Sequence, residues 1–353
     1  MLYRASRNWL TVSKDSHGNV EPLLTHLRIC LLMDEDSPVL PGGFLGGSAP
    51  CLREIYLDGI PFPTLPTLLL STSNLAILTL SMIPPTGIIS PEAMVTCLAV
   101  LPSLESLTIE FHTSTPYPDR ISPTPATRTV LPALASFNFQ GACEYLEEFV
   151  AQIDGPQLND IWIVYMDEPY DFQVTQLSKF VDSSVGPELT PSRRAHVTFH
   201  VNRVVFILYR QENYLGGDQR SVETSIYPDE LNWGITEMAE VLSRFSATLS
   251  TVVHLELEFQ FMDDESLLES ANNVDWLYLF RHFPAMRILD VSWGLAMHVA
   301  IALEDITTEL ATEVFPSLHL VFLEGEPAPS IETIFAAGSL SNRPVTFVET
   351  RGV

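Results

Sequence analysis

PSLESLTI, residues 102–109, contains the most informative pattern of this chain: a proline at the first position, followed by apolar residues at the third, sixth and eighth positions. The pattern returns as PLLTHLRI (22–29), PCLREIYL (50–57), PALASFNF (132–139), PQLNDIWI (156–163), PAMRILDV (284–291) and PSLHLVFL (316–323). SNLAILTL (73–80) and STVVHLEL (250–257) repeat it without the proline. Apart from one gap of 94 residues, the first apolar positions lie 23 to 34 residues apart, and this spacing indicates a repeat architecture.

The spacing within each copy predicts a short β-strand. The last two apolar residues are two positions apart, so both side chains face the same side of a strand. The first apolar residue, the anchor of the repeat, is expected to pack at the bend before that strand. Proline fixes φ and lacks an N–H group, which suits a turn just before a strand. One such strand cannot bury its apolar face alone, so we expect the strands to stack in a parallel sheet.

The segments between the predicted strands have helical periodicity. Apolar residues at i, i+3, i+4 and i+7 occur in residues 94–101, 146–153 and 238–249. Ser90 followed by Pro91 is a typical start for the first of these helices. The 94-residue gap has room for two divergent repeats, and residues 204–209 (VVFILY) form one candidate strand within it.

These units resemble the strand units of leucine-rich-repeat proteins. LPSLESLTI (101–109), LPALASFNF (131–139), FPSLHLVFL (315–323) and RRAHVTFHV (193–201) are similar to the repeat region of the large fungal F-box/leucine-rich-repeat families. The resemblance implies an α/β leucine-rich-repeat solenoid, or horseshoe, with parallel strands on the concave face and irregular helices on the convex face. We expect one solenoid over residues 1–353, with repeats at about 20–340, a divergent middle at about 170–249 and caps at 2–10 and 331–348.

The same resemblance implies a function. Proteins of this family use the repeats to bind substrates of a cullin-type ubiquitin ligase, and an F-box module before the repeats docks on the ligase linker. Residues 1–20 are too short for that module, so a ligase linker is an expected partner only if an F-box lies outside this chain. We therefore expect a non-enzymatic protein-recognition module. The alternative is a free-standing acidic scaffold or inhibitor that binds a basic protein and is unrelated to ubiquitin.

The candidate binding residues are those that alternate with the buried positions of each strand, because they point away from the core. They include carboxylates and possible aromatic anchors for a protein partner. The candidates are Glu54, Tyr56, Asp58, Glu110, Asp160, Trp162, Glu256, Glu258, Asp290 and Phe322. Two interpretations stay open: a surface selective for a basic partner, or a solvated face on a chain that is acidic throughout.

Charge excludes several classes of partner. The chain has 44 acidic and 18 basic residues and a net charge of −26. This balance argues against nucleic acid, whose counterions must be displaced by Lys and Arg, and against anionic membrane surfaces. The first residues lack a signal-peptide core, and the four cysteines form no CxxC pair, so a reducing cytoplasmic or nuclear location is expected.

No motif in the sequence predicts catalysis, a cofactor or a metal. The glycine-rich stretch at 41–47 lacks the context of a phosphate loop, and the acidic clusters at 34–36 and 262–265 lack the ligand spacing of a calcium loop. His196 and His200 lie four apart on a predicted strand and are interpreted as core or surface histidines. Residues 113–129 are predicted to form a protruding loop in which Ser122 and Thr124 are possible phosphorylation sites.

Overall fold

The structure is a computed structural model, and it divides into two compact units that are described separately. Unit 1 consists of Met1–Asp167 and Thr175–Gly186, and unit 2 of Glu168–Val174 and Pro187–Val353. The structure describes residues 11–14, 20–30, 39–40, 45, 49–61, 65–113, 128–166, 174–184, 194–200, 203–211, 219–227, 231–260, 273–292, 294–296, 298–299, 310, 313–324 and 346–350. Several predicted features lie outside these residues: the N-terminal cap, both acidic clusters, Ser122 and Thr124. Most of the glycine-rich stretch and most of the C-terminal cap also lie outside them.

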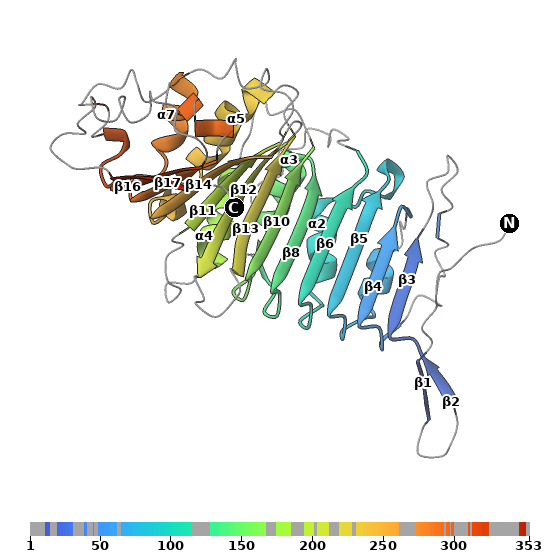
Figure 1. Cartoon of the computed structure of the whole chain (residues 1–353). Helices are drawn as coiled ribbons and strands as arrows, with labels where there is room; N and C mark the ends of the chain where they lie inside the picture. The colour runs from blue at the N-terminus through green and yellow to red at the C-terminus, as the bar shows by residue number, and fades with distance from the viewer. Residues whose placement is uncertain are drawn as a thin grey trace. The chain divides into compact units, whose positions relative to one another are not determined.

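Unit 1 contains a run of parallel strands in sequence order (Figure 1). These are β3 (His26–Cys30), β4 (Glu54–Asp58), β5 (Ile77–Ile83), β6 (Ser106–Phe111), β8 (Ser136–Gly141) and β10 (Asp160–Tyr165), each paired with the next. Between them lie α1 (Leu65–Leu69), the 3₁₀ turn η2 (Pro85–Gly87), α2 (Pro91–Leu98), α3 (Cys143–Val150) and α4 (Thr175–Ser184). Two small ladders complete the unit: β1 (Thr11–Lys14) pairs with β2 (Val20–Leu23), and β7 (Thr129–Val130) with β9 (Ile153–Asp154).

Unit 2 contains a second run of strands. The parallel part consists of β11 (Arg194–Phe199), β14 (His254–Phe259), β15 (Ile288–Val291), β16 (Leu320–Glu324) and β17 (Thr346–Thr350), paired in that order. On the other side of β11, β12 (Val204–Gln211) and β13 (Gln219–Ile226) add antiparallel pairs. The helices are α5 (Leu231–Ser243), α6 (Ser246–Leu249) and α7 (Asn273–Phe280). The predicted α/β class with a mostly parallel sheet is therefore confirmed.

The predicted proline turn is present before the repeat strands. In eight of the nine repeats the anchor N–H donates to the carbonyl three residues earlier, at 3.0 to 3.5 Å, and where these repeats have a proline it occupies the second position of the turn. That position favours proline because its φ is already near the required value. The anchors in these turns are at most 2% exposed; they are Leu52, Leu75, Leu104, Leu134, Leu158, Val252, Met286 and Leu318. The first repeat (22–29) departs from the prediction: Pro22 lies within β2, paired with Val12, and the anchor Leu24 is half-buried.

A second recurring contact fixes the register between repeats. The carbonyl of the residue just before each strand accepts hydrogen bonds from two successive N–H groups of the next repeat. For example, Glu105 accepts from Ala135 and Ser136 at 2.8 and 3.0 Å. In unit 2, Val253 accepts from Arg287 and Ile288 at 2.8 and 3.0 Å. Neighbouring strands consequently start level with one another, so corresponding residues of successive repeats lie side by side.

The core of unit 1 lies between the sheet and the helices. Phe137 of β8 stacks on Phe149 of α3, with ring centroids 5.8 Å apart, and meets Phe180 of α4 edge-on at 6.1 Å. Helix α2 starts as predicted, because the Ser90 hydroxyl accepts a hydrogen bond from the N–H of Ala93 at 3.3 Å. The helix predicted over 146–153 ends earlier, and Ile153 belongs to β9. Among the described residues, no helix is both long and apolar enough to cross a membrane.

One expectation about the divergent middle is corrected. Residues 204–209 do form a strand, but β12 runs antiparallel to its neighbours and is not another parallel repeat strand. The reason is the short link to β11, where the N–H of His200 donates to the carbonyl of Arg203 at 2.8 Å. Such a tight turn can join only antiparallel strands, whereas a parallel connection needs a dozen or more residues.

Candidate functional site

In unit 1, the candidate residues lie on the face of the sheet whose side chains alternate with the buried core positions; we call it the outer face. Tyr56 of β4 and Trp162 of β10 occupy the same row across the sheet. The residues between them in this row are Thr79, Thr108 and Asn138. Four strand steps of roughly 4.8 Å separate the backbone positions of the two residues by about 19 Å, so the register places them in one row on non-adjacent strands.

Tyr56 already has a cationic neighbour. The Arg28 guanidinium lies over the Tyr56 ring, 4.3 Å from its centroid. Burial raises the pKa of the neighbouring Asp58 carboxyl, and the positive charge of Arg28 partly offsets this effect. Farther along the row, the Asn138 side chain donates to the Thr108 hydroxyl at 3.3 Å. The middle of the row is therefore polar and uncharged, with Tyr56 near one end and Trp162 at the other.

The remaining carboxylates of unit 1 do not converge on one point. Glu54 and Asp160 share a second row, four strands apart, and Glu54 lies 3.8 Å from the Nε2 atom of His26. Glu110 is level with Gln140, whose amide lies 3.4 Å from the sulfur of Met166. This distribution spreads the carboxylates over several strands of unit 1 and provides an extended acidic surface.

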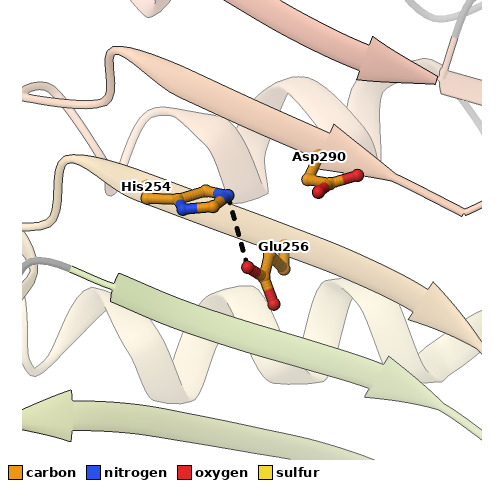
Figure 2. Close-up of side chains that lie close together, drawn as sticks. All are labelled: His254, Glu256 and Asp290. Carbon is orange, nitrogen blue, oxygen red and sulfur yellow. Dashed lines mark ion pairs between the residues drawn. The ribbon is translucent and has the colours of Figure 1, made fainter. Parts of the chain in front are cut away.

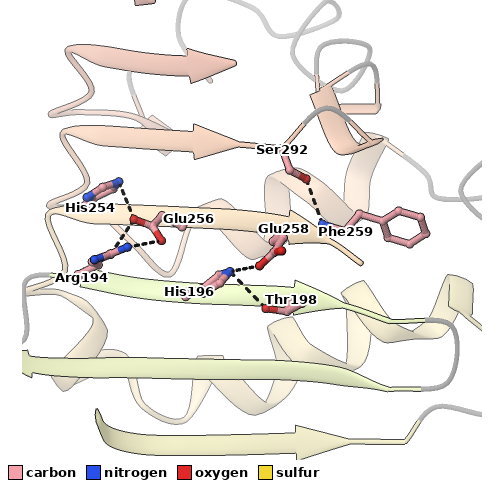
Figure 3. Close-up of polar contacts among 8 residues, drawn as sticks. All are labelled: Arg194, His196, Thr198, His254, Glu256, Glu258, Phe259 and Ser292. Atoms are coloured by element: carbon pink, nitrogen blue, oxygen red, sulfur yellow. Dashed lines mark hydrogen bonds and ion pairs between the residues drawn. The ribbon is translucent and has the colours of Figure 1, made fainter. Parts of the chain in front are cut away.

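In unit 2, charged side chains from β11 and β14 lie close together (Figure 3). Arg194 binds Glu256 through two contacts, Nε to Oε1 at 2.6 Å and Nη2 to Oε2 at 2.8 Å. The Nε2 atom of His254 lies 3.3 Å from the same Oε1 atom. We call Arg194, His254, Glu256 and Asp290 the charged cluster. Its two-point Arg–carboxylate contact holds the Glu256 side chain in one orientation.

A second pair lies beside the charged cluster. The Nε2 atom of His196 is 3.0 Å from Glu258 and 3.2 Å from the hydroxyl of Thr198. His200, near the end of the same strand, is 9% exposed; burial and then the charge of Arg203 lower its pKa, while Glu258 raises it. Glu258 therefore acts on both histidines that the sequence places four apart: it lies against His196, and its charge opposes the lowering of the His200 pKa by burial.

Asp290 joins this surface because of the strand register. Glu256 and Asp290 are direct partners across the parallel β14–β15 pair. The ligand atoms of His254, Glu256 and Asp290 all lie within 4.8 Å of one another, and the three side chains are half-buried (Figure 2). Phe322 of β16 is the next residue in the row after Asp290 and is also half-buried. The structure therefore gathers Glu256 and Asp290, while Glu258 contacts His196.

Four residues of this surface are not among the candidate binding residues predicted from the sequence: Arg194, His196, Thr198 and His254. A signal was present in RAHVTFH (194–200), where polar and apolar residues alternate strictly. Alternation on one strand predicts that Arg194, His196 and Thr198 share a face. It does not predict which residues of other repeats lie opposite them, because that depends on the pairing of β11 with β14, more than fifty residues away along the chain.

The two outer faces differ in what they offer a ligand. The face of unit 1 provides aromatic rings, hydroxyl and amide groups and separated carboxylates, whereas the face of unit 2 provides a compact group of imidazole, carboxylate and guanidinium groups. Both sets suit noncovalent recognition or coordination. No model of a known protein family matches the sequence, and no curated protein matches it either.

Proposed function

We propose that the protein is a non-enzymatic recognition module built as an α/β leucine-rich-repeat solenoid, and that the outer face of its sheet strands binds a protein partner. The observation that carries this proposal is the level register of the repeat strands. Each repeat contributes side chains to the same rows, which makes an extended surface of regularly spaced groups. Repeat proteins commonly use such surfaces for binding.

The aromatic residues are the proposed anchors of the interface. Tyr56 and Trp162 are half-buried, so each has exposed ring surface that a partner can cover while its position stays fixed by neighbours. Aromatic residues contribute most to protein interfaces when they are held in place and then desolvated by the partner. The polar row between them, including Thr108 and Asn138, offers hydrogen bonds that would orient a bound chain.

The proposed partner class follows from the repeats quoted above and their similarity to F-box/leucine-rich-repeat receptors. In that role the module would bind the substrate of a cullin-type ubiquitin ligase. Co-purification tests this directly: if an F-box lies outside this chain, the protein expressed together with that module should recover the linker subunit and the cullin. Recovery of a protein partner without either ligase subunit would contradict the ligase role and leave the recognition role standing.

The charge of unit 1 supports a second candidate, an acidic scaffold or inhibitor for a basic protein. Its outer face carries Glu54, Asp58, Glu110 and Asp160, while the guanidinium of Arg28 lies over a tyrosine ring. Charged residues at the edge of a protein interface mainly change the rate of association with the partner. For a basic partner, raising the salt concentration from 50 to 500 mM should therefore slow association at least about tenfold in surface plasmon resonance. A salt-independent association rate would exclude this candidate.

We expect Trp162→Ala to weaken partner binding by at least about 2 kcal/mol, or roughly thirtyfold in Kd. The physical reason is loss of the apolar ring surface at one end of the row. Binding is measured by titration calorimetry with the partner recovered by affinity purification. Tyr278→Ala is the matched control, because Tyr278 is an aromatic residue, 36% exposed, on α7 and away from the strand rows. Equal affinities for wild type and Trp162→Ala would remove the aromatic row from the proposed interface.

A further inference from the structure

We propose that His254, Glu256 and Asp290 form a binding site for a divalent transition metal ion, with Zn²⁺ as the best-suited ion. Metal binding here does not require that the proposed protein-binding function is correct. It rests on three potential ligand atoms from two adjacent strands that lie within 4.8 Å of one another. The sequence predicts no metal ligands here, because the three residues form no recognisable motif along the chain.

The ligand chemistry favours zinc over the harder cations. One imidazole nitrogen and two carboxylate oxygens form a mixed nitrogen–oxygen set, whereas calcium and magnesium take oxygen ligands almost exclusively. Three protein ligands with further positions left for water match the usual arrangement of an open zinc site. The imidazole nitrogen is the group that selects a transition metal here.

The geometry is close to that of a coordinated ion. In tetrahedral zinc sites with bonds of about 2.0–2.1 Å, two ligand atoms are separated by roughly 3.3 Å. The Nε2 atom of His254 and the Oε1 atom of Glu256 are 3.3 Å apart, so this pair already has the required separation. The Asp290 ligand atom lies within 4.8 Å of the other two and would have to move closer to complete the ligand set.

The backbone positions of the ligands are fixed by the sheet. His254 and Glu256 are two residues apart on β14 and therefore share a face, and Asp290 is the direct partner of Glu256 on β15. The His254 and Glu256 side chains are 22% and 15% exposed, which leaves access for an ion while limiting the water that competes for it. Ligands on paired strands keep their spacing better than ligands on loops.

Arg194 limits the affinity of this site for a metal ion. Its guanidinium contacts both carboxylate oxygens of Glu256, at 2.6 and 2.8 Å. An ion bound at Oε1 would displace Nε and leave Nη2 on Oε2, with two positive charges a few ångströms apart. The metal and Arg194 therefore compete for Glu256, and removing the charge of Arg194 should strengthen metal binding.

Titration calorimetry of chelator-treated full-length protein with Zn²⁺, at pH 7.5, tests the proposal. We expect a saturable site in the wild type and a Kd at least about tenfold higher in both His254→Gln and Asp290→Asn, because each removes one ligand. His196→Gln is the matched control: it changes a histidine on the same face, whose Nε2 atom is directed to Glu258. This control should retain the wild-type Kd, and bound Co²⁺ should show visible absorption bands that both ligand variants lose.

Several outcomes would overturn the site. Absence of saturable Zn²⁺ binding in the wild type would remove it, and unchanged binding in His254→Gln and Asp290→Asn would place the ion elsewhere. Equal loss in His196→Gln would show that the assigned ligand set is wrong. Arg194→Gln, which keeps a hydrogen-bond donor and removes the charge, should bind Zn²⁺ several-fold more tightly. Unchanged or weaker binding in that variant would contradict the competition for Glu256.

Discussion

Phe137→Ala should lower the free energy of unfolding by about 3–5 kcal/mol, the usual range for removing a large aromatic side chain from a packed core. Phe137 is 0% exposed and contacts the rings of Phe149 and Phe180. The substitution removes one ring and also leaves both partner rings without a neighbour on one side. Denaturant unfolding followed by circular dichroism measures the loss, and hydrogen exchange of the β8 amides localises it.

Two variants control for this result. Phe137→Leu retains most of the apolar volume and should cost clearly less than the alanine variant. Val130→Ala alters an apolar residue of the same unit that is 55% exposed, and it should change stability by no more than about 0.5 kcal/mol. A loss below about 1 kcal/mol in Phe137→Ala would show that β8, α3 and α4 do not share one cooperative core.

Glu147→Ala should lower the free energy of unfolding by about 1–3 kcal/mol, because it leaves two backbone donors without their acceptors. The Glu147 carboxylate on α3 accepts hydrogen bonds from the N–H groups of Gln176 and Leu177, at 2.7 and 2.8 Å. These groups belong to the first turn of α4, whose N–H groups have no partner within the helix. Glu147 thus acts as the cap of a helix that starts nearly thirty residues later.

Hydrogen exchange at Gln176 and Leu177 should accelerate in Glu147→Ala more than exchange in α2, which has its own cap at Ser90. Glu147→Gln keeps one carbonyl oxygen as an acceptor and should lose less stability than the alanine variant. Glu144→Ala, an exposed acidic residue on the same helix, should leave α4 unchanged. If Glu144→Ala and Glu147→Ala destabilise α4 equally, the stability of α4 depends on the negative charge of α3 and not on the capping contact.

The Glu147 carboxyl also makes stability depend on pH. Burial raises its pKa above the ordinary value of 4.5, against the lowering effects of the α4 N–H groups and Lys179. A raised pKa means that the folded protein holds this proton more tightly than the unfolded chain. The proton-dependent part of the stability that comes from this group is therefore greatest below pH 4.5 and is lost as pH rises through the folded-state pKa, while the capping contacts with the α4 N–H groups remain. The free energy of unfolding is measured for the wild type and for Glu147→Gln at a series of pH values. As pH rises through the folded-state pKa, the wild type should lose stability relative to Glu147→Gln.

The repeat strands could be predicted because their determinants are local. Anchors such as Leu104, apolar positions two apart and proline in the preceding turn each act within eight residues, so the sequence contains the whole signal. The helix that starts after Ser90 was predictable for the same reason. The sequence predicts β12 correctly as a strand, but the expected parallel direction is wrong. The direction depends on the short link to β11, where His200 and Arg203 are hydrogen-bonded.

Trp162 and Tyr56 could be assigned to one outer face from alternation alone, but their shared row required the register of four successive strand pairs. The charged cluster was less accessible to sequence reasoning. Glu256 and Asp290 are separate candidates in the sequence, whereas Arg194 and His254 gain their importance only from the atoms beside them.

Short strands at recurring positions, with apolar residues buried on one side and polar residues on the other, follow from local features of the amino-acid sequence. Which polar residues meet depends on how distant strands pair. The pairing of β11 with β14 and of β14 with β15 places Arg194, Glu256 and Asp290 together, although they are separated along the chain by 62 and 34 residues. Side-chain alternation is a property of neighbouring residues, whereas hydrogen-bonded register is a property of distant segments brought together by burial of their shared apolar face.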